Sequence, residues 1–241
     1  MRKMLSLLTL LTFASTLPAT AGPALSPVSQ DAMEGSAEDP AGPEPWPATS
    51  RTRHSIQLAG QTVSYTAEAG TLALAEEDGT ETAHVFYVAY VRDVADGEDP
   101  EERPITFTFN GGPGSSSVWL HMGAFGPRRV RMDPEGFPLA PPGELVDNDF
   151  SLLDFTDLVF IDPVTTGYSR AAEDEDPQRF HGVEEDVEAV GEFIRRYTTR
   201  ARRWGSPKYL SGESYGTTRA AGLVQHLQGR HGMYFNGVVL V

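Results

Sequence analysis

The sequence predicts an α/β fold in which antiparallel strands lead into a mostly parallel sheet. Short alternating apolar runs with glycine turns follow residue 51, as is typical of antiparallel strands. A continuous apolar run at 157–162 has the composition of a parallel strand covered on both faces. Helical patterns separate it from the later strands, so strands and helices alternate over the second half of the chain.

Composition limits the classes of protein to consider. The 241 residues are 39% hydrophobic and 10% aromatic, which is enough for one domain with a core. The formal net charge is −15, and such a surface repels phosphate backbones, so we expect no nucleic-acid partner. The chain has 0 cysteines, so its stability must come from packing alone. This favours a bacterial periplasmic or secreted protein over a eukaryotic secreted one.

The first 50 residues are predicted to lie outside the folded domain. Residues 1–21 have two basic residues, an apolar run and a small-x-small ending, which is the pattern of a secretory signal peptide. No second apolar run is long enough to span a bilayer, so we expect no membrane attachment after signal cleavage. Residues 22–50 are rich in proline and acidic residues and predict a disordered leader. The domain should occupy residues 51–241.

The antiparallel part is expected to contain several strands. Apolar residues alternate at 56–58, 63–65 and 72–74, and a longer run covers 84–91. The expected turns are at three glycines, Gly60, Gly70 and Gly79. The acidic segment 93–102 is predicted to be a solvated loop without a functional role.

A glycine-rich turn follows the next strand, 105–109. Residues 110–117 are Asn-Gly-Gly-Pro-Gly-Ser-Ser-Ser, and an apolar-rich segment comes after them. A strand that ends in glycines before a helix exposes unpaired backbone N–H groups. Such fixed donors stabilise a developing oxyanion. A tight structural turn or a phosphate cradle would have similar glycines, but the phosphate loop ends in Gly-Lys-Ser/Thr, which is missing here.

Two further segments lie between the glycine-rich turn and the last motif. Residues 163–169 should form a loop at the carboxyl end of strand 157–162 and line the ligand cleft, with Asp162 capping or bracing the turn. Apolar residues recur at helical spacing from Val183 to Tyr197, with acidic residues 184–186 at the start and arginines toward the end. We interpret this segment as a crossover helix whose charges match its dipole, rather than as a metal site. No metal or other cofactor is expected.

The segment from Lys208 to Leu223 predicts a strand, a sharp turn and a helix. Its centre, residues 212–216, is Gly-Glu-Ser-Tyr-Gly. This Gly-x-Ser-x-Gly spacing is that of a nucleophile elbow, in which the serine adopts a strained conformation and the glycines allow close packing. Ser214 would then point its hydroxyl into a cleft at the sheet edge where the glycine-rich turn also lies. The alternative is an ordinary strand-to-helix turn. These residues indicate an α/β hydrolase that performs acyl transfer through Ser214.

Three motifs in this order, 110–114, 161–169 and 212–216, make the chain resemble the serine carboxypeptidase family over residues 51–241. Members of that family are α/β hydrolases that release C-terminal residues from peptides. The resemblance implies an α/β-hydrolase fold, of which this chain would be the N-terminal portion, and a peptide as substrate. The oligomeric state is not predicted.

The resemblance also implies roles for five residues. Ser214 would be the nucleophile, and the backbone N–H groups of Gly112 and Tyr215 would form the oxyanion hole. Asn110 and Glu213 would bind the terminal carboxylate of the substrate. A carboxyl side chain donates to a carboxylate only when it is protonated, which favours binding in acid.

The sequence departs from the family at two positions. Ser115 occupies a position where the family commonly has cysteine, so the associated disulfide is absent. Ala124 stands where family members often have a glutamate that helps to recognise the carboxylate. The resemblance therefore implies a simpler carboxylate site than usual.

A serine nucleophile needs a histidine base and an acid that orients it, and in this fold they follow the serine in the order Asp or Glu, then His. The 27 residues after Ser214 contain no acidic residue. His226 and His231 are predicted to point away from the cleft, and the four earlier histidines are expected to be structural or surface residues. We therefore expect either a C-terminally truncated family member or a non-catalytic relic, and the end of the chain inside the apolar run 235–241 favours truncation.

The expected function is thus that of a serine-type carboxypeptidase, with the activity assigned to a full-length parent. An acyltransferase or esterase on the same scaffold is an alternative that the motifs do not distinguish. A binding module that keeps the cleft without the chemistry is a second alternative.

Overall fold

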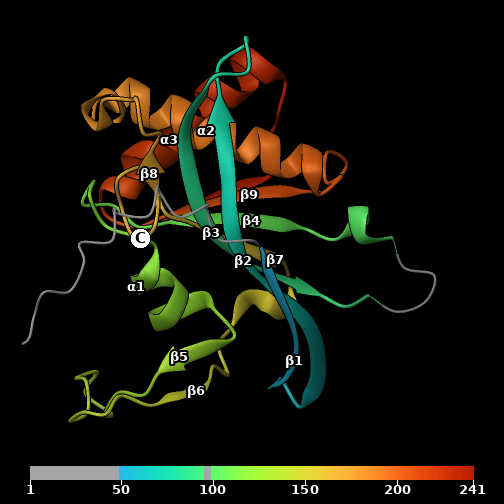
Figure 1. The fold of residues 1–241 in the computed structure, drawn as a ribbon. Coiled ribbons are helices and arrows are strands. Elements are labelled where there is room, and N and C mark those ends of the chain that lie inside the picture. Colours follow the sequence, from blue (N-terminus) through green and yellow to red (C-terminus); the bar gives the residue numbers. More distant parts are fainter. Residues whose placement is uncertain (1–48, 95–98) are drawn as a thin grey trace, which may run out of the picture. The chain divides into compact units, whose positions relative to one another are not determined.

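The computed structural model describes residues 49–94 and 99–241. The predicted signal peptide and nearly all of the predicted leader lie outside these ranges. The described part is built around an eight-stranded mixed sheet (Figure 1). The strands of its main path, in order across the sheet, are β1 (Ser50–Leu58), β2 (Gln61–Ala75), β3 (Glu81–Arg92), β7 (Asp157–Ile161), β4 (Ile105–Phe109), β9 (Lys208–Gly212) and β10 (Gly237–Leu240). The short β8 (Arg170–Ala171) pairs with the first part of β3.

The strand directions confirm the predicted change from antiparallel to parallel pairing. β1, β2 and β3 form an antiparallel meander, and β3 is also antiparallel to β7. From β7 onward, the pairs with β4, β9 and β10 are parallel. Every residue of β4 and β7 is buried, as the continuous apolar runs predict.

Two of the three predicted glycine turns are confirmed. Gly60 has φ +79° between β1 and β2, and Gly79 has φ +92° between β2 and β3, a backbone region that favours glycine. The turn predicted at Gly70 is wrong, because this residue lies within the 15-residue β2 and pairs with Tyr87. A Cβ at Gly70 would lie 2.8 Å from Thr49 Oγ1, so glycine is needed here because Thr49 packs closely against its backbone.

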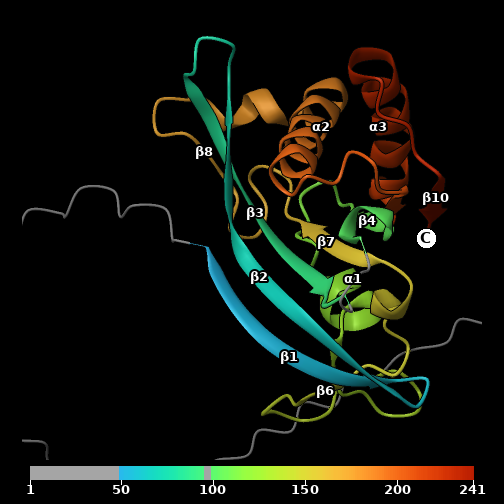
Figure 2. The same ribbon diagram turned by 90° about the vertical axis from the view of Figure 1, so that its right-hand side faces the viewer.

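Two long helices cover one face of the sheet. α2 (Val183–Arg200) and α3 (Tyr215–His231) lie side by side against the parallel strands (Figures 1 and 2). α2 confirms the predicted amphipathic crossover helix. The two helices approach closely, since a Cβ at Gly222 would lie 2.7 Å from Val187 Cγ2. The core on this side contains Phe107, Phe193 and many other apolar residues.

The opposite face carries shorter elements and a second core cluster. α1 (Val118–Leu120) continues into a π-helical segment, His121–Phe125, and a two-stranded sheet joins β5 (Arg128–Val130) to β6 (Leu145–Asp147). Short 3₁₀ helices lie at Pro100–Glu102, Leu152–Asp154 and Pro177–Phe180. Leu120, Leu153 and Phe160 are among the buried side chains on this side. Across residues 49–94 and 99–241, neither long helix is apolar enough to cross a bilayer.

Candidate active site

The predicted strand, turn and helix around Ser214 are present. β9 ends at Gly212, α3 begins at Tyr215, and Ser214 between them is exposed with φ 56° and ψ −122°. This conformation is costly for a residue with a side chain. A Cβ at Gly212 would overlap the carbonyl of Gly216, and one at Gly216 would lie 2.9 Å from the carbonyl oxygen of Phe109. Both glycines are therefore required by close backbone packing.

The glycine-rich turn lies directly against this elbow. Phe109, at the end of β4, is the register partner of Gly212, so the segments that follow both strands start side by side. A Cβ at Gly111 would lie 2.7 Å from the Glu213 carbonyl oxygen and closer still to Tyr215 N. The diglycine backbone thus touches the elbow backbone, as the hypothesis of a shared site at one sheet edge requires.

Backbone donors are available where the two segments meet. Tyr215 is the first residue of α3, a position whose N–H has no partner within its own helix. In the described part of the chain, the N–H of Gly112 donates to no protein group. Gly112 has φ +107°, which a residue with a side chain rarely adopts. The N–H of Ser214 is already used, since it donates to the Val241 carbonyl oxygen at 3.0 Å.

The two residues assigned by resemblance to carboxylate binding contact each other. Asn110 is fully buried, and its Nδ2 donates to Glu213 Oε2 at 3.0 Å. The Asn110 side chain is held in place by Leu120, whose N–H donates to Asn110 Oδ1 at 3.0 Å. Since Glu213 is partly exposed and only its Oε2 accepts from Asn110, its other carboxyl oxygen is available to a ligand.

A buried arginine that the sequence analysis did not single out lies behind these residues. Arg219 is completely buried, and its Nη1 donates to the Asn110 carbonyl oxygen at 2.7 Å. Its Nε donates to Asp186 Oδ2 at 2.8 Å. A signal existed in the sequence, because Arg219 falls in the buried stripe of α3 that also contains Gly216, Leu223 and Leu227.

This pairing adds a buried contact to the first turn of α2. Asp186 lies in that turn with the other two acidic residues, as the predicted dipole matching requires, and it is also buried and paired with Arg219. Burial raises the pKa of the Asp186 carboxyl, and the hydrogen bond and charge of Arg219 act in the opposite direction. Glu184 and Glu185 remain in the first turn, where dipole matching is expected.

Asp162 has the bracing role that was predicted for it. Its Oδ1 accepts from the Ser117 N–H at 2.9 Å, and a Cβ at Gly167 would overlap its Oδ2. Burial raises the pKa of the Asp162 carboxyl. Asp162 therefore joins the glycine-rich segment to the loop at 163–169. Tyr168 in this loop is 70% exposed and packs edge-on against Phe86.

His121 is part of the core on the face opposite to α2 and α3. His121 stacks on Phe160 with ring centroids 4.5 Å apart, and its Nε2 lies 2.6 Å from the Tyr90 hydroxyl. Burial lowers the pKa of His121 to about 4. No histidine within residues 49–94 and 99–241 makes a hydrogen bond with Ser214.

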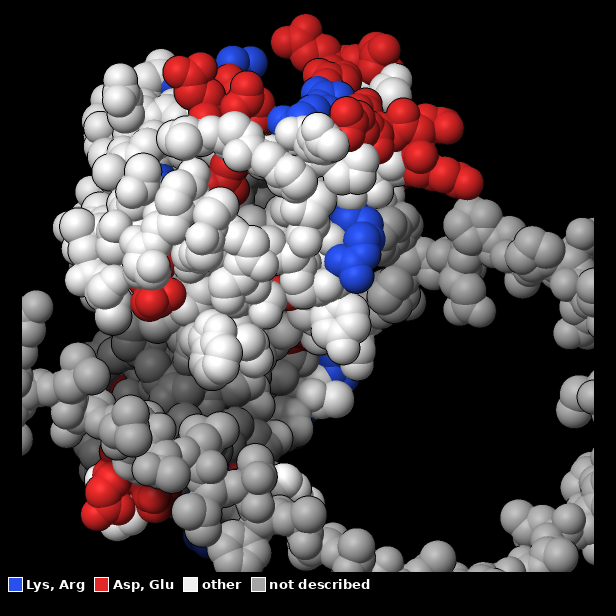
Figure 3. All heavy atoms as spheres, turned by 90° about the vertical axis from the view of Figure 1, so that its left-hand side faces the viewer, with Lys and Arg blue, Asp and Glu red and all other residues white. Residues whose placement is uncertain are grey.

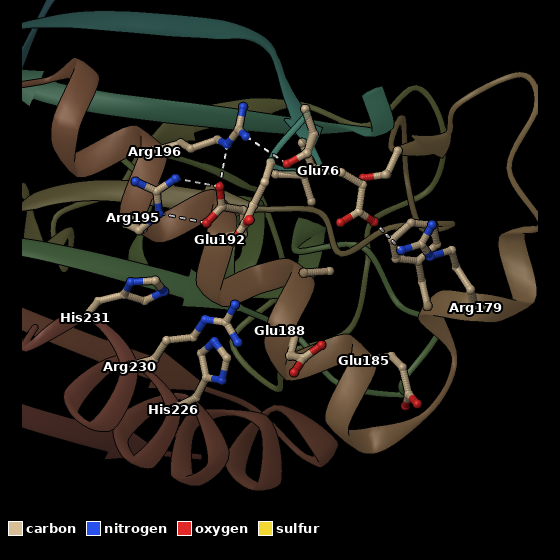
Figure 4. A pocket seen from close by; sticks show the side chains of 16 residues that line it. Glu76, Arg179, Glu185, Glu188, Glu192, Arg195, Arg196, His226, Arg230 and His231 are labelled. Carbon is tan, nitrogen blue, oxygen red and sulfur yellow. Dashed lines mark hydrogen bonds and ion pairs between the residues drawn. The ribbon is translucent and has the colours of Figure 1, made fainter. Parts of the chain in front are cut away.

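His226 and His231 line a different hollow. It has a volume of about 420 Å³ and lies between α2, α3 and the turn that joins β2 to β3. Figure 4 shows both histidines near Arg230, with Glu185 and Glu188 farther along the same hollow. No residue of the elbow or the glycine-rich turn lines it, so the prediction that these histidines point away from the cleft is confirmed.

Charged side chains are unevenly distributed on the described surface. Figure 3 shows one face of the molecule, on which uncharged side chains occupy the middle of the described part and acidic groups gather at its upper margin. Exposed aromatic side chains are available on segments next to the site, since Trp119 at the start of α1 is 70% exposed.

Comparison with known proteins settles the family. The model of the serine carboxypeptidase family matches residues 58–239. The chain belongs to the serine carboxypeptidase family. It is 25% identical over 164 residues to Serine carboxypeptidase-like 5 of Arabidopsis thaliana, covering 66% of this chain and 34% of that protein. It is 31% identical over 148 residues to Carboxypeptidase Y homolog A of Phaeosphaeria nodorum, covering 58% of this chain and 23% of that protein.

Solved structures confirm the α/β-hydrolase fold of this serine carboxypeptidase family member. The structure of Kex1, a prohormone-processing carboxypeptidase from Saccharomyces cerevisiae, matches with a TM-score of 0.54 and 23% identity. The match covers 73% of this chain and 38% of the Kex1 chain. The chain spans about a third of the length of the plant relatives it matches.

Proposed function

We propose that this chain provides the nucleophile and the oxyanion hole of a serine-type carboxypeptidase. Ser214 would attack the carbonyl carbon of the C-terminal peptide bond, form an acyl-enzyme and release the terminal residue. Water would then hydrolyse the acyl-enzyme. The observation that supports this most directly is the exposed, strained Ser214 in an elbow whose backbone contacts the diglycine turn.

The amides of Gly112 and Tyr215 would stabilise the tetrahedral intermediate. Both belong to the two touching segments, and both are free of competing backbone partners in the arrangement described above. Donors fixed in this way need no reorganisation as negative charge develops on the substrate oxygen. Removing one such donor typically lowers kcat about 10²- to 10³-fold.

The pair of Asn110 and Glu213 would bind the terminal carboxylate of the peptide. The Asn110 amide is fixed by its contact with Leu120 and holds one oxygen of Glu213, so a proton on the other oxygen could be donated to the substrate. Ala124 provides no further carboxyl group at the position where relatives often have one. The resulting site would favour peptides with a free C-terminus.

Hydrolysis also requires a histidine base and an acid that orients it. No histidine in the described ranges is bonded to Ser214, so we expect no peptidase turnover from residues 1–241 alone. Measurable turnover that is lost in Ser214→Ala would contradict this expectation. Activity should appear in a complete gene product that supplies both groups, and the DNA sequence beyond the Val241 codon shows whether they are encoded.

The decisive experiment is covalent labelling of the complete gene product with a fluorophosphonate. Modification that maps to Ser214 and is lost in Ser214→Ala is the expected result. Absence of labelling in the folded protein would support a non-catalytic binding module instead. Transfer of the acyl group to an added alcohol in preference to water would indicate an acyltransferase or esterase.

Substrate class can be tested with a matched pair of peptides. A blocked dipeptide with a free carboxylate should be cleaved faster than the same dipeptide as its amide. Glu213→Ala should reduce this preference and affect the amide much less, because the amide has no carboxylate to bind. Equal cleavage of both peptides by the unmodified protein would exclude the carboxylate-binding role of Asn110 and Glu213.

We also propose that the protein is exported to the periplasm or secreted. This proposal rests on the pattern of residues 1–21 in the sequence. Cell fractionation of a tagged protein, with and without residues 1–21, tests it. Retention of both forms in the same compartment would refute export through this segment.

A further inference from the structure

We propose that Arg219 is a positioning residue that holds the two halves of the oxyanion hole in register. This inference rests on the proposed function of Ser214 and its neighbouring amides. Arg219 is completely buried, so its role would be indirect. It would act by fixing the end of β4, where the Gly112 amide follows, to the first turn of α3, which contains the Tyr215 amide.

The hydrogen bonds of Arg219 join three separate elements. The residue itself belongs to α3, one turn after Tyr215. Its Nη1 bonds the carbonyl of Asn110, which directly precedes the diglycine turn, at 2.7 Å. Its Nε bonds Asp186 on α2 at 2.8 Å. A single rigid side chain therefore links the glycine-rich turn, the elbow helix and the crossover helix.

Aromatic contacts place the guanidinium between the same two segments. Arg219 Cζ lies 5.4 Å from the ring centroid of Phe109 and 5.2 Å from that of Tyr215. Phe109 is the last residue of β4, and Tyr215 directly follows Ser214. Such cation–π contacts hold best where the cation is removed from water, as it is here. Loss of the guanidinium would thus free both donor segments to shift relative to each other.

Packing alone gives little reason for a charged side chain at this position. A completely buried arginine must be compensated, and replacing a buried ion pair by apolar groups of similar volume is often neutral or stabilising. Within the described residues, Nη2 of Arg219 has no hydrogen-bond partner at all. What the guanidinium does provide is a planar group with fixed directions to the Asn110 carbonyl and the Asp186 carboxylate. This points to geometry as its contribution.

The chain offers a matched control for the experiment. Arg203 is also buried, and its Nη1 bonds a buried aspartate, Asp157, at 2.6 Å. Asp157 is the first residue of β7, so this pair lies at the opposite end of the parallel strands from Ser214. Arg203→Met and Arg219→Met each remove a buried guanidinium that is paired with an aspartate, although Asp157 also accepts a hydrogen bond from Arg103. Only Arg219→Met is expected to disturb the amides.

The test measures fluorophosphonate labelling of Ser214 in the complete gene product over a range of reagent concentrations. Arg219→Met should lower the limiting rate of labelling about 10- to 100-fold, since misplacement of a catalytic group by 1 Å costs about this much. The reagent concentration at half-maximal rate should change little. Arg219→Lys should recover only part of the rate, because one ammonium group cannot form the same fork. Arg203→Met should label at the unmodified rate.

Each outcome distinguishes the two proposals. Labelling of Arg219→Met at the unmodified rate would overturn the positioning role and leave the proposed function intact. If the unmodified protein is not labelled, the proposed function fails, and the NMR shifts of the Gly112 and Tyr215 amides decide the positioning role. They should move in Arg219→Met and not in Arg203→Met, and unmoved shifts overturn the inference. If Arg219→Met does not fold, Arg219→Lys serves for both measurements.

Discussion

Replacing Gly111 by alanine tests the contact on which the candidate site depends. The new methyl carbon would lie 2.7 Å from the Glu213 carbonyl oxygen and 2.8 Å from Gly216 N, and closer still to Tyr215 N. All three neighbours are backbone atoms, which cannot swing aside as the end of a side chain can. To restore ordinary van der Waals contact, the glycine-rich turn and the elbow must separate by roughly 1 Å.

The size of the effect follows from this separation. Insertion of an extra carbon into a well-packed region costs about 1–3 kcal/mol of folding free energy. A displacement of about 1 Å between reacting groups lowers rates about 10²-fold. We therefore expect Gly111→Ala to fold with reduced stability and to react with a fluorophosphonate about 100 times more slowly in the complete gene product.

Gly114→Ala is the matched control, since a Cβ at Gly114 in the same turn would meet nothing within 4 Å. Urea denaturation gives the stability of each variant, and labelling time courses give the rates. Gly114→Ala should match the unmodified protein in both measurements. A Gly111→Ala protein with unchanged stability and an unchanged labelling rate would refute the described contact between the two segments.

Three further predictions concern stability. Ser214→Gly should raise the free energy of unfolding by about 1 kcal/mol, because glycine adopts φ 56° without strain. Urea denaturation measures the effect. A lower urea midpoint for Ser214→Gly than for Ser214→Ala would contradict this prediction. Asp186→Asn should lower the free energy of unfolding by about 3 kcal/mol, because Arg219 is left as an uncompensated buried charge; an unchanged urea midpoint would show that the pair is not stabilising. In the folded protein His121 stays neutral down to a pKa of about 4, whereas in the unfolded chain it protonates near pH 6.5. Protonation therefore favours the unfolded chain as the pH falls from 6.5 to 4, and the free energy of unfolding drops by up to about 3 kcal/mol. His121→Phe should therefore lose less stability than the unmodified protein between pH 7 and pH 4 in urea titrations, and an equal loss would count against this origin.

Local sequence patterns predicted most strands of the large sheet, both long helices, and the strand, turn and helix around Ser214. The apolar run of β7 and the helical spacing of α2 predict buried elements because burial imposes these periods directly. The elbow was predictable because its backbone tolerates only glycine on either side of Ser214. Close packing at Gly111 also requires glycine, which explains the glycine-rich motif at 110–114. Figure 1 shows the segments after β4 and β9 at one edge of the sheet.

Long-range contacts explain what the sequence did not predict. By local sequence, Gly70 resembles a turn residue. In the structure it lies within β2, and its close contact with Thr49, 21 positions earlier, explains the glycine. Local pattern assigns Asp186 to the acidic first turn of α2 and places Arg219 in the buried stripe of α3, but it does not pair them. Their partnership spans 33 positions and exists only because α2 and α3 pack together over the sheet. The spacing of α3 can therefore indicate that Arg219 is buried, but not which carboxylate compensates its charge.

The hydrogen bonds at the end of β10 link the nucleophile to the last strand on the path of the sheet. Val241 N donates to the Gly212 carbonyl oxygen at 2.9 Å, and the Val241 carbonyl accepts from Ser214 N at 3.0 Å. The side chains of Val239 and Leu240 are exposed in the described part of the chain. Because the Ser214 amide donates to Val241, amide exchange at Ser214 should report how often β10 separates from the elbow. A molecule that binds β10 and keeps it paired would also preserve the hydrogen bond that fixes the Ser214 backbone.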